Sequence, residues 1–228
     1  MHLDIRVAAL TWLGCWLGGN TVGAAVLAAA GQGDSSEPTP IWAVAIAAAC
    51  LWLPMMAALA VLSRRSGTGD LRADYNVGFR VIDLVGVPIG VLSQLVLVPV
   101  LYLPLEQLWP SAFDGTERER NARDLYESAQ GGWLVVLIVI VVIGAPLVEE
   151  LVYRGLLQGA FVRRLDDTVA VVVVAAWFAL IHFRPVEYPG LFAFGLVLGL
   201  CAQQTRRLGM SILAHVAFNA TGLILVAR

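Results

Sequence analysis

The sequence has little charge and no lysine. Only 14% of its 228 residues are charged, and all 15 basic residues are arginine. Soluble domains carry about 25% charged residues, so this composition argues against a soluble globular enzyme. The net charge of −2 leaves no basic surface for nucleic acid, and no nucleic-acid partner is expected.

Cysteine is equally scarce. Cys15, Cys50 and Cys201 lie within apolar runs, and no pair has the Cys-x-x-Cys spacing. Buried cysteine behaves as a small apolar residue. We therefore expect neither a disulfide nor a cysteine-based metal site.

Apolar residues make up 59% of the chain and are gathered into long runs. A helix needs about 20 apolar residues to cross a hydrocarbon core about 30 Å thick. The expected fold is therefore all-α, a polytopic transmembrane helical bundle of about seven to eight spans. The candidate spans are residues 7–30, 41–63, 81–103, 133–162, 168–183, 189–204 and 208–227.

The arginines predict the orientation of these spans. Arginine is enriched in cytoplasmic loops, and the alternating linkers divide the arginines unequally, so the N-terminus is expected in the cytoplasm. On the outer side, the segment from Thr116 to Ser128 is expected to form a short amphipathic helix. The arginines expected on the cytoplasmic side are Arg6, Arg64, Arg65, Arg72, Arg80, Arg163, Arg164, Arg206 and Arg207.

Three charges interrupt the fourth span. Each charge at the centre of a bilayer costs about 2.5–3.5 kcal/mol on insertion scales, so Glu149, Glu150 and Arg154 need partners or a task. Glu150 and Arg154 are four residues apart and share a helix face, which predicts an ion pair. Glu149 points about 100° away and has no partner within its helix, so it is expected to face a cavity. A purely structural network of all three is the alternative.

Pro146 precedes these charges and predicts a kink in the long fourth span. Proline cannot donate a backbone hydrogen bond, so we expect the carboxylates in the first turn of a lower half-helix. Near the inner end of the third span, Asp83 is expected to pair with Arg80, three residues earlier.

Two histidines also fall within apolar spans. His182 ends one span, and His215 is followed four residues later by Asn219 on the same helix face. A single histidine in an apolar helix is most simply a satisfied core residue. Together with Glu149, these residues predict a site if the helices bring them to the same depth.

These residues resemble the motifs of the CPBP family, which includes the type II CAAX prenyl endopeptidases and the bacteriocin-processing or immunity (Abi) proteins of bacteria. Residues 149–155 read EELVYRG, similar to the family motif E-E-x-x-x-R. The motifs F-x-x-x-H, ending at His182, and H-x-x-x-N, beginning at His215, follow in order. The resemblance covers residues 133–227.

The resemblance implies one integrated membrane domain in two parts. Residues 1–132 would hold the N-terminal spans with the outer amphipathic loop, and residues 133–228 the catalytic helical core. The implied activity is that of an intramembrane endopeptidase, which hydrolyses a peptide bond of a membrane-associated substrate. Such a substrate would be prenylated, lipoprotein-like or bacteriocin-like, and the lipid bilayer is the other expected partner.

The resemblance also implies roles for the site residues. Glu149 would be the general base that activates water, and His182 would help to hold that water. His215 and Asn219 would stabilise the oxyanion, while the ion pair beside Glu149 would fix the rotation of the helix. No cofactor is required by this scheme. The alternative is a divalent metal such as zinc, held by Glu149, His182 and His215.

Two other functions compete with the peptidase. The first is a non-catalytic immunity or regulatory membrane protein of the same family. The second is a transporter or proton relay, which needs a polar path across the membrane; the apolar stretch over residues 133–143 argues against such a path. The heavy use of Arg and Ala suggests a bacterial plasma membrane as the location.

Overall fold

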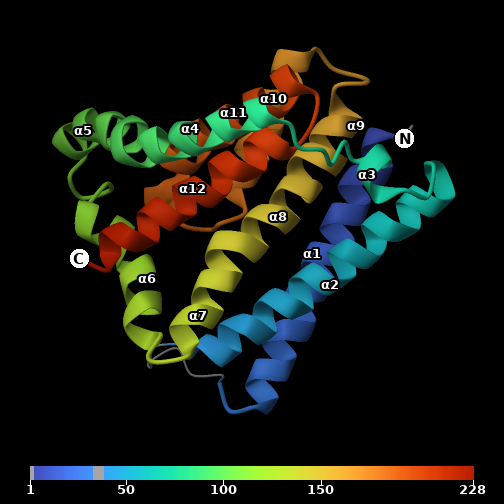
Figure 1. Cartoon of the computed structure of the whole chain (residues 1–228). Coiled ribbons are helices and arrows are strands. Elements are labelled where there is room, and N and C mark those ends of the chain that lie inside the picture. Colours follow the sequence, from blue (N-terminus) through green and yellow to red (C-terminus); the bar gives the residue numbers. More distant parts are fainter. Residues whose placement is uncertain (1–2, 33–38) are drawn as a thin grey trace.

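The computed structural model describes residues 3–32 and 39–228, and within these ranges it is all-helical (Figure 1). The predicted fold class is confirmed. Part of the predicted linker over residues 31–40 lies outside the described residues. Six helices are long and apolar enough to cross a membrane, namely Ile5–Ala29, Ile41–Ser66, Val81–Leu108, Trp133–Phe161, Pro185–Thr205 and Gly209–Val226.

Some of these helices are single elements, and others consist of several shorter ones. Ile5–Ala29 is α1, Ile41–Ser66 is α2 and Gly209–Val226 is α12, while Pro185–Thr205 consists of η5 (Pro185–Glu187) and α11 (Tyr188–Thr205). The third long helix consists of η1 (Val81–Val85), α4 (Gly86–Leu92), η2 (Ser93–Leu97) and α5 (Val98–Leu108). The short helices outside the spans are α3 (Leu71–Asp74) and α6 (Gly115–Ser128).

The predicted segment 168–183 forms the shorter helix α10, Asp167–Leu180. With 14 residues, it is shorter than the roughly 20 residues that cross a bilayer. The described residues therefore contain six helices of crossing length and one short apolar helix, so an eighth span is not found there. The predicted outer amphipathic segment is helical as expected, and forms α6.

The helix Trp133–Phe161 is continuous through Pro146, so the span is not divided into two separate helices, and the predicted kink at this proline stays a prediction. Its elements are α7 (Trp133–Ile138), η3 (Val139–Gly144), α8 (Ala145–Glu149), η4 (Glu150–Gln158) and α9 (Gly159–Phe161). Both η3 and η4 have the wider π-helical geometry. A π-helical turn before the proline changes which backbone groups are paired, and the helix continues without an end at Gly144.

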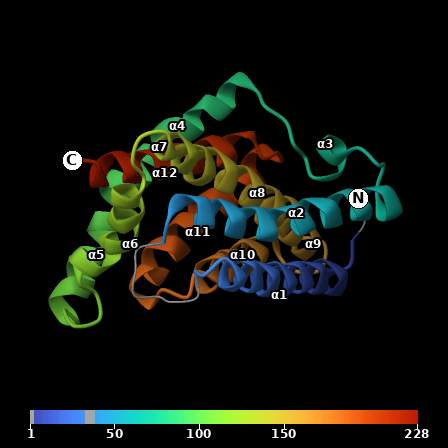
Figure 2. The same cartoon turned by 90° about the horizontal axis from the view of Figure 1, so that it is seen from below.

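Helices from both parts of the chain pack together around this long helix. α1 and α2 lie side by side on one flank, and α12 runs along α4 on the other (Figures 1 and 2). α10 packs along α11, and α1 contacts η4. The residues of η4 are consequently enclosed by helices that come from distant parts of the sequence.

Two glycines allow α4 to approach α12 closely. A Cβ atom on Gly90 would overlap the backbone oxygen of Ala214 and would lie 2.9 Å from the Cβ of Ala217. A Cβ atom on Gly86 would overlap the oxygen of Met210. Because neither glycine has a side chain, α4 and α12 can pack this closely. The close packing positions α12, the helix that carries His215.

We expect Gly90→Ala to destabilise the protein by about 1–3 kcal/mol, because the added methyl group overpacks this contact. Thermal unfolding of the purified protein in detergent measures the effect. Gly18→Ala is the matched control, since a Cβ atom at Gly18 on α1 meets nothing within 4 Å. An equal or higher unfolding temperature for Gly90→Ala would contradict the tight approach of the two helices.

Asp83 also fixes α12, but with a different partner from the one predicted. Its carboxylate accepts hydrogen bonds of 2.9 and 2.8 Å from Nε and Nη2 of Arg207. Arg80 contributes its backbone N–H, at 2.7 Å, rather than a side-chain ion pair. The bidentate contact therefore joins the start of the third long helix to the turn before α12, 124 residues later.

Candidate active site

The predicted ion pair between Glu150 and Arg154 is formed, and it is completely buried. Nη1 of Arg154 lies 3.0 Å from Oε1 of Glu150, and neither side chain has any exposed surface. The guanidinium carbon also lies 4.9 Å from the centre of the Phe178 ring. Since each charge is costly to bury alone, the position of each one depends on the other.

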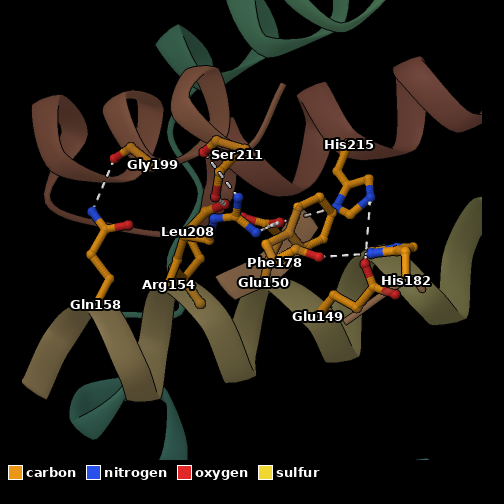
Figure 3. Close-up of polar contacts among 11 residues, drawn as sticks. Glu149, Glu150, Arg154, Gln158, Phe178, His182, Gly199, Leu208, Ser211 and His215 are labelled. Atoms are coloured by element: carbon orange, nitrogen blue, oxygen red, sulfur yellow. Dashed lines mark hydrogen bonds and ion pairs between the residues drawn. The ribbon is translucent and has the colours of Figure 1, made fainter. Parts of the chain in front are cut away.

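A second polar contact ties the same helix face to α11. Nη2 of Arg154 donates to the backbone oxygen of Gly195 at 3.1 Å. One turn later, Nε2 of Gln158 donates to the backbone oxygen of Gly199 at 3.0 Å. A helical carbonyl has a second lone pair for such a bond. These two parallel hydrogen bonds fix the rotation of η4 relative to α11 (Figure 3).

His215 joins both carboxylates. Its Nδ1 lies 3.0 Å from Oε1 of Glu150, and its Nε2 lies 3.7 Å from Oε2 of Glu149. The imidazole is buried between the rings of Phe178 and Phe194, whose centres lie 5.9 and 5.5 Å from it. The four-residue spacing of Glu150 and Arg154 places both side chains on one face of the long helix. The packing of α12 against that helix brings His215 to the two carboxylates.

The partner of Nδ1 determines which proton His215 carries. Glu150 is paired with Arg154 and is therefore an acceptor, so Nδ1 of His215 donates to it. In the neutral imidazole, Nε2 is then an acceptor, and it becomes a donor only when the ring is protonated. His215 can therefore take the role that the resemblance implies, donation from Nε2 to an oxyanion, only when its ring is protonated.

His182 lies at the end of α10 beside the same aromatic ring. Its Nδ1 is 2.7 Å from the backbone oxygen of Phe178, and the two rings are 5.0 Å apart. A carbonyl only accepts, so Nδ1 donates and Nε2 of the neutral ring is an acceptor. The side chains of His182, His215 and Glu149 point toward one another in Figure 3.

The two adjacent glutamates differ sharply in exposure. The side chain of Glu149 is 27% exposed, whereas that of Glu150 has no exposed surface. The distance of 3.7 Å from Glu149 to His215 is too long for a direct hydrogen bond. Glu149 is thus the carboxylate of the pair that has exposed surface, and it is not held by an ion pair with Arg154.

Asn219 lies one turn beyond His215, but its amide is directed to another helix. Nδ2 donates to the backbone oxygen of Val141 in η3 at 2.8 Å. Asn219 also lines a cavity of about 350 Å³ between α5, α6, α11 and α12. The structure therefore joins Glu149, His182 and His215 through short contacts and a shared aromatic ring, and places Asn219 at the edge of this group.

The residue types predicted for zinc are suitable, but their arrangement is not. A zinc site needs at least three protein ligands around one point. No group of three or more His, Cys, Asp or Glu side chains within residues 3–32 and 39–228 is placed to hold a metal ion. Nδ1 of each histidine is hydrogen-bonded to another partner, which leaves only Nε2 of each ring free to ligate. The side chains as placed do not fit a resident metal.

Sequence reasoning missed Gln158 and the glycines of α11 that receive the hydrogen bonds. Gln158 is four residues after Arg154 within an apolar span, so its position on the same face was a usable signal. Nothing in the spacing of Gly195 and Gly199 identifies their carbonyls as acceptors. The cluster as a whole contains a partly exposed carboxylate, two imidazoles and a buried ion pair.

A comparison with known families finds a match over the part of the chain that carries this cluster. Residues 131–221 match the family described as type II CAAX prenyl endopeptidase, Rce1-like. The match contains all six predicted site residues and confirms the resemblance to the CPBP family. It supports a membrane protease, and six apolar helices support an integral membrane protein. Comparisons with curated proteins and with solved structures find no match.

Proposed function

We propose that the protein is an intramembrane endopeptidase that hydrolyses a peptide bond with water activated by Glu149. The single observation that carries this proposal is the difference between the two adjacent carboxylates. Glu150 is fully buried in an ion pair with Arg154, while the side chain of Glu149 is 27% exposed and faces His215. A carboxylate reachable by water and beside two imidazoles is suited to general acid–base catalysis.

In the proposed reaction, Glu149 takes one proton from a bound water, and Nε2 of His182 accepts a hydrogen bond from its other hydrogen. The water oxygen forms a bond to the peptide carbonyl carbon and produces a tetrahedral oxyanion. His215, protonated and paired with Glu150, donates from Nε2 to that oxyanion. Glu149 then returns its proton to the leaving amide nitrogen as the carbon–nitrogen bond breaks.

The second amide hydrogen of Asn219 remains for the oxyanion or the substrate backbone, because one hydrogen is given to Val141. The cavity that Asn219 lines is mainly apolar, with leucine, valine and proline side chains among its walls. This surface supports a membrane-associated peptide as the substrate, whether prenylated, lipoprotein-like or bacteriocin-like.

We also propose that the N-terminus lies in the cytoplasm of a bacterial cell. Two ion pairs bring arginine-rich segments to one side: Arg164 contacts Asp4 at 3.3 Å, and Arg207 contacts Asp83 at 2.8 Å. Arginine-rich segments that lie together on one side favour the cytoplasmic face. Reporter fusions placed in the loops after α2 and α5 test this orientation, with the first expected inside and the second outside.

The function is tested by comparing membrane and secreted peptides from native cells that carry either the wild type or Glu149→Gln. We expect uncleaved precursors to accumulate in the variant, and their sequences identify the substrate class. An unchanged peptide profile, with the variant protein folded and at its normal level, would instead support an immunity or regulatory protein.

We expect metal chelation to leave this activity unchanged, because the proposed groups activate water without a metal ion. Once a substrate is identified, the purified enzyme is dialysed against 1,10-phenanthroline and assayed with and without added zinc. If turnover is lost on dialysis and returns with zinc, Glu149 does not activate water without a metal ion. That result would support the alternative of a metallopeptidase.

A further inference from the structure

One backbone carbonyl in the long helix Trp133–Phe161 loses both of its usual helical donors. In an α-helix, the oxygen of Val141 would accept from the N–H of Ala145, four residues later. Here that N–H donates to Ile140 instead, five residues back, as in a π-helical turn. The next π-type donor for Val141 would be residue 146, which is proline and has no N–H.

Asn219 supplies the missing donor from α12. Its Nδ2 lies 2.8 Å from the oxygen of Val141, so the side-chain amide donates to the carbonyl that Pro146 cannot serve. Within a membrane, an unpaired backbone carbonyl is costly, and side chains of neighbouring helices commonly satisfy the groups that proline frees. This contact accounts for the continuation of the helix through Pro146.

We propose that Asn219 is a positioning residue, whose amide replaces the missing backbone donor of Pro146 and thereby fixes the helix that aims Glu149 at His215. Glu149 lies three residues after Pro146, and His215 lies one turn before Asn219 on α12. The same contact therefore holds the two helices together one turn from His215 and about two turns from Glu149. The consequence for cleavage rests on the proposed function, whereas the hydrogen bond and its structural effect do not.

The inference is tested by restoring the backbone donor. The full-length variants are Asn219→Ala, Pro146→Ala and the double variant that combines them. Thr221→Ala is the matched control, because its hydroxyl also bonds a backbone carbonyl, that of Ala217, but within its own helix α12. Amide hydrogen exchange of residues 139–149 is measured by mass spectrometry in lipid nanodiscs, and precursor processing is measured in cells.

We expect Asn219→Ala to accelerate exchange in this segment roughly tenfold, the effect of losing one buried hydrogen bond. Pro146→Ala alone and Thr221→Ala should exchange as the wild type does. In the double variant, the backbone N–H that Pro146→Ala introduces pairs with Val141, so exchange should return to within about twofold of the wild type. If Asn219→Ala fails to accumulate as folded protein, recovery of folded yield in the double variant is the equivalent result.

Normal exchange in Asn219→Ala, or fast exchange that the double variant does not correct, overturns the inference. Processing separates positioning from direct contact with the substrate. Recovery of exchange in the double variant supports positioning. If processing stays low in that variant, the second amide hydrogen of Asn219 also serves the reacting atoms, as the proposed reaction has it. If even the wild type processes no precursor, the proposed function fails, and the exchange data still decide the inference.

Discussion

Glu149→Gln should reduce turnover by about 10³-fold or more, while the protein folds as the wild type does. General-base catalysis contributes about 10²–10⁴-fold, and a glutamine cannot take the proton from water. The fold should tolerate the change because the substitution preserves shape. The nearest charged partner, Nε2 of His215, is 3.7 Å away, and the side chain is 27% exposed.

The measurement is the rate of cleavage of an identified precursor by purified wild-type and variant enzymes, with thermal unfolding as the test of folding. Glu106→Gln is the matched control, since Glu106 lies on α5 in an ion pair with Arg118 of α6. It should retain full turnover. Unchanged turnover in Glu149→Gln would remove Glu149 from the role of base, even if the protein proved to be a peptidase.

Spacing along the chain predicted the features that lie within one helix. The Glu150–Arg154 pair follows from a separation of four residues, and the sequence also indicates the face on which Gln158 lies. The apolar runs located all seven helical segments, because their length and composition reflect the thickness of the bilayer. The ends of the segments differ from the predicted ranges by several residues at places such as Val81–Leu108.

Contacts between helices could not be predicted in the same way. The pairing of Asp83 with Arg207, and of His215 with Glu150, depends on how each helix is rotated against its neighbour. That rotation is set by close approaches such as that of Gly90 to Ala214, for which the sequence gives no unique register. The sequence allowed the histidines and carboxylates to lie at the same depth, but any rotation of α12 was equally compatible with that.

The way in which the helix continues through Pro146 could not be predicted from the sequence. Proline normally ends or bends a helix because its missing N–H leaves a carbonyl unpaired. In this chain the π-helical turn moves that deficit to Val141, and Asn219 on α12 satisfies it. Neither the π-helical turn nor a donor from a helix 78 residues later is visible in local sequence.

Arg154→Met should destabilise the folded protein by about 3–5 kcal/mol, the usual effect of removing one partner from a buried ion pair. Methionine keeps most of the side-chain volume, so the loss reflects the uncompensated charge of Glu150, whose side chain has no exposed surface. The hydrogen bond to Gly195 is lost as well. Unfolding in detergent measures the effect. Arg120→Met is the control, because its pair with Glu117 is exposed and is worth about 1 kcal/mol or less.

Adding Glu150→Gln to Arg154→Met should recover much of this stability, because the double variant no longer buries an unpaired charge. Turnover should stay low, since the neutral amide of glutamine holds a protonated His215 less strongly than the carboxylate that now lies 3.0 Å from its Nδ1. The two measurements thus separate the two tasks of Glu150, which are to balance Arg154 and to orient His215. A double variant with full turnover would show that Glu150 only balances charge, and wild-type stability in Arg154→Met would contradict the buried pair itself.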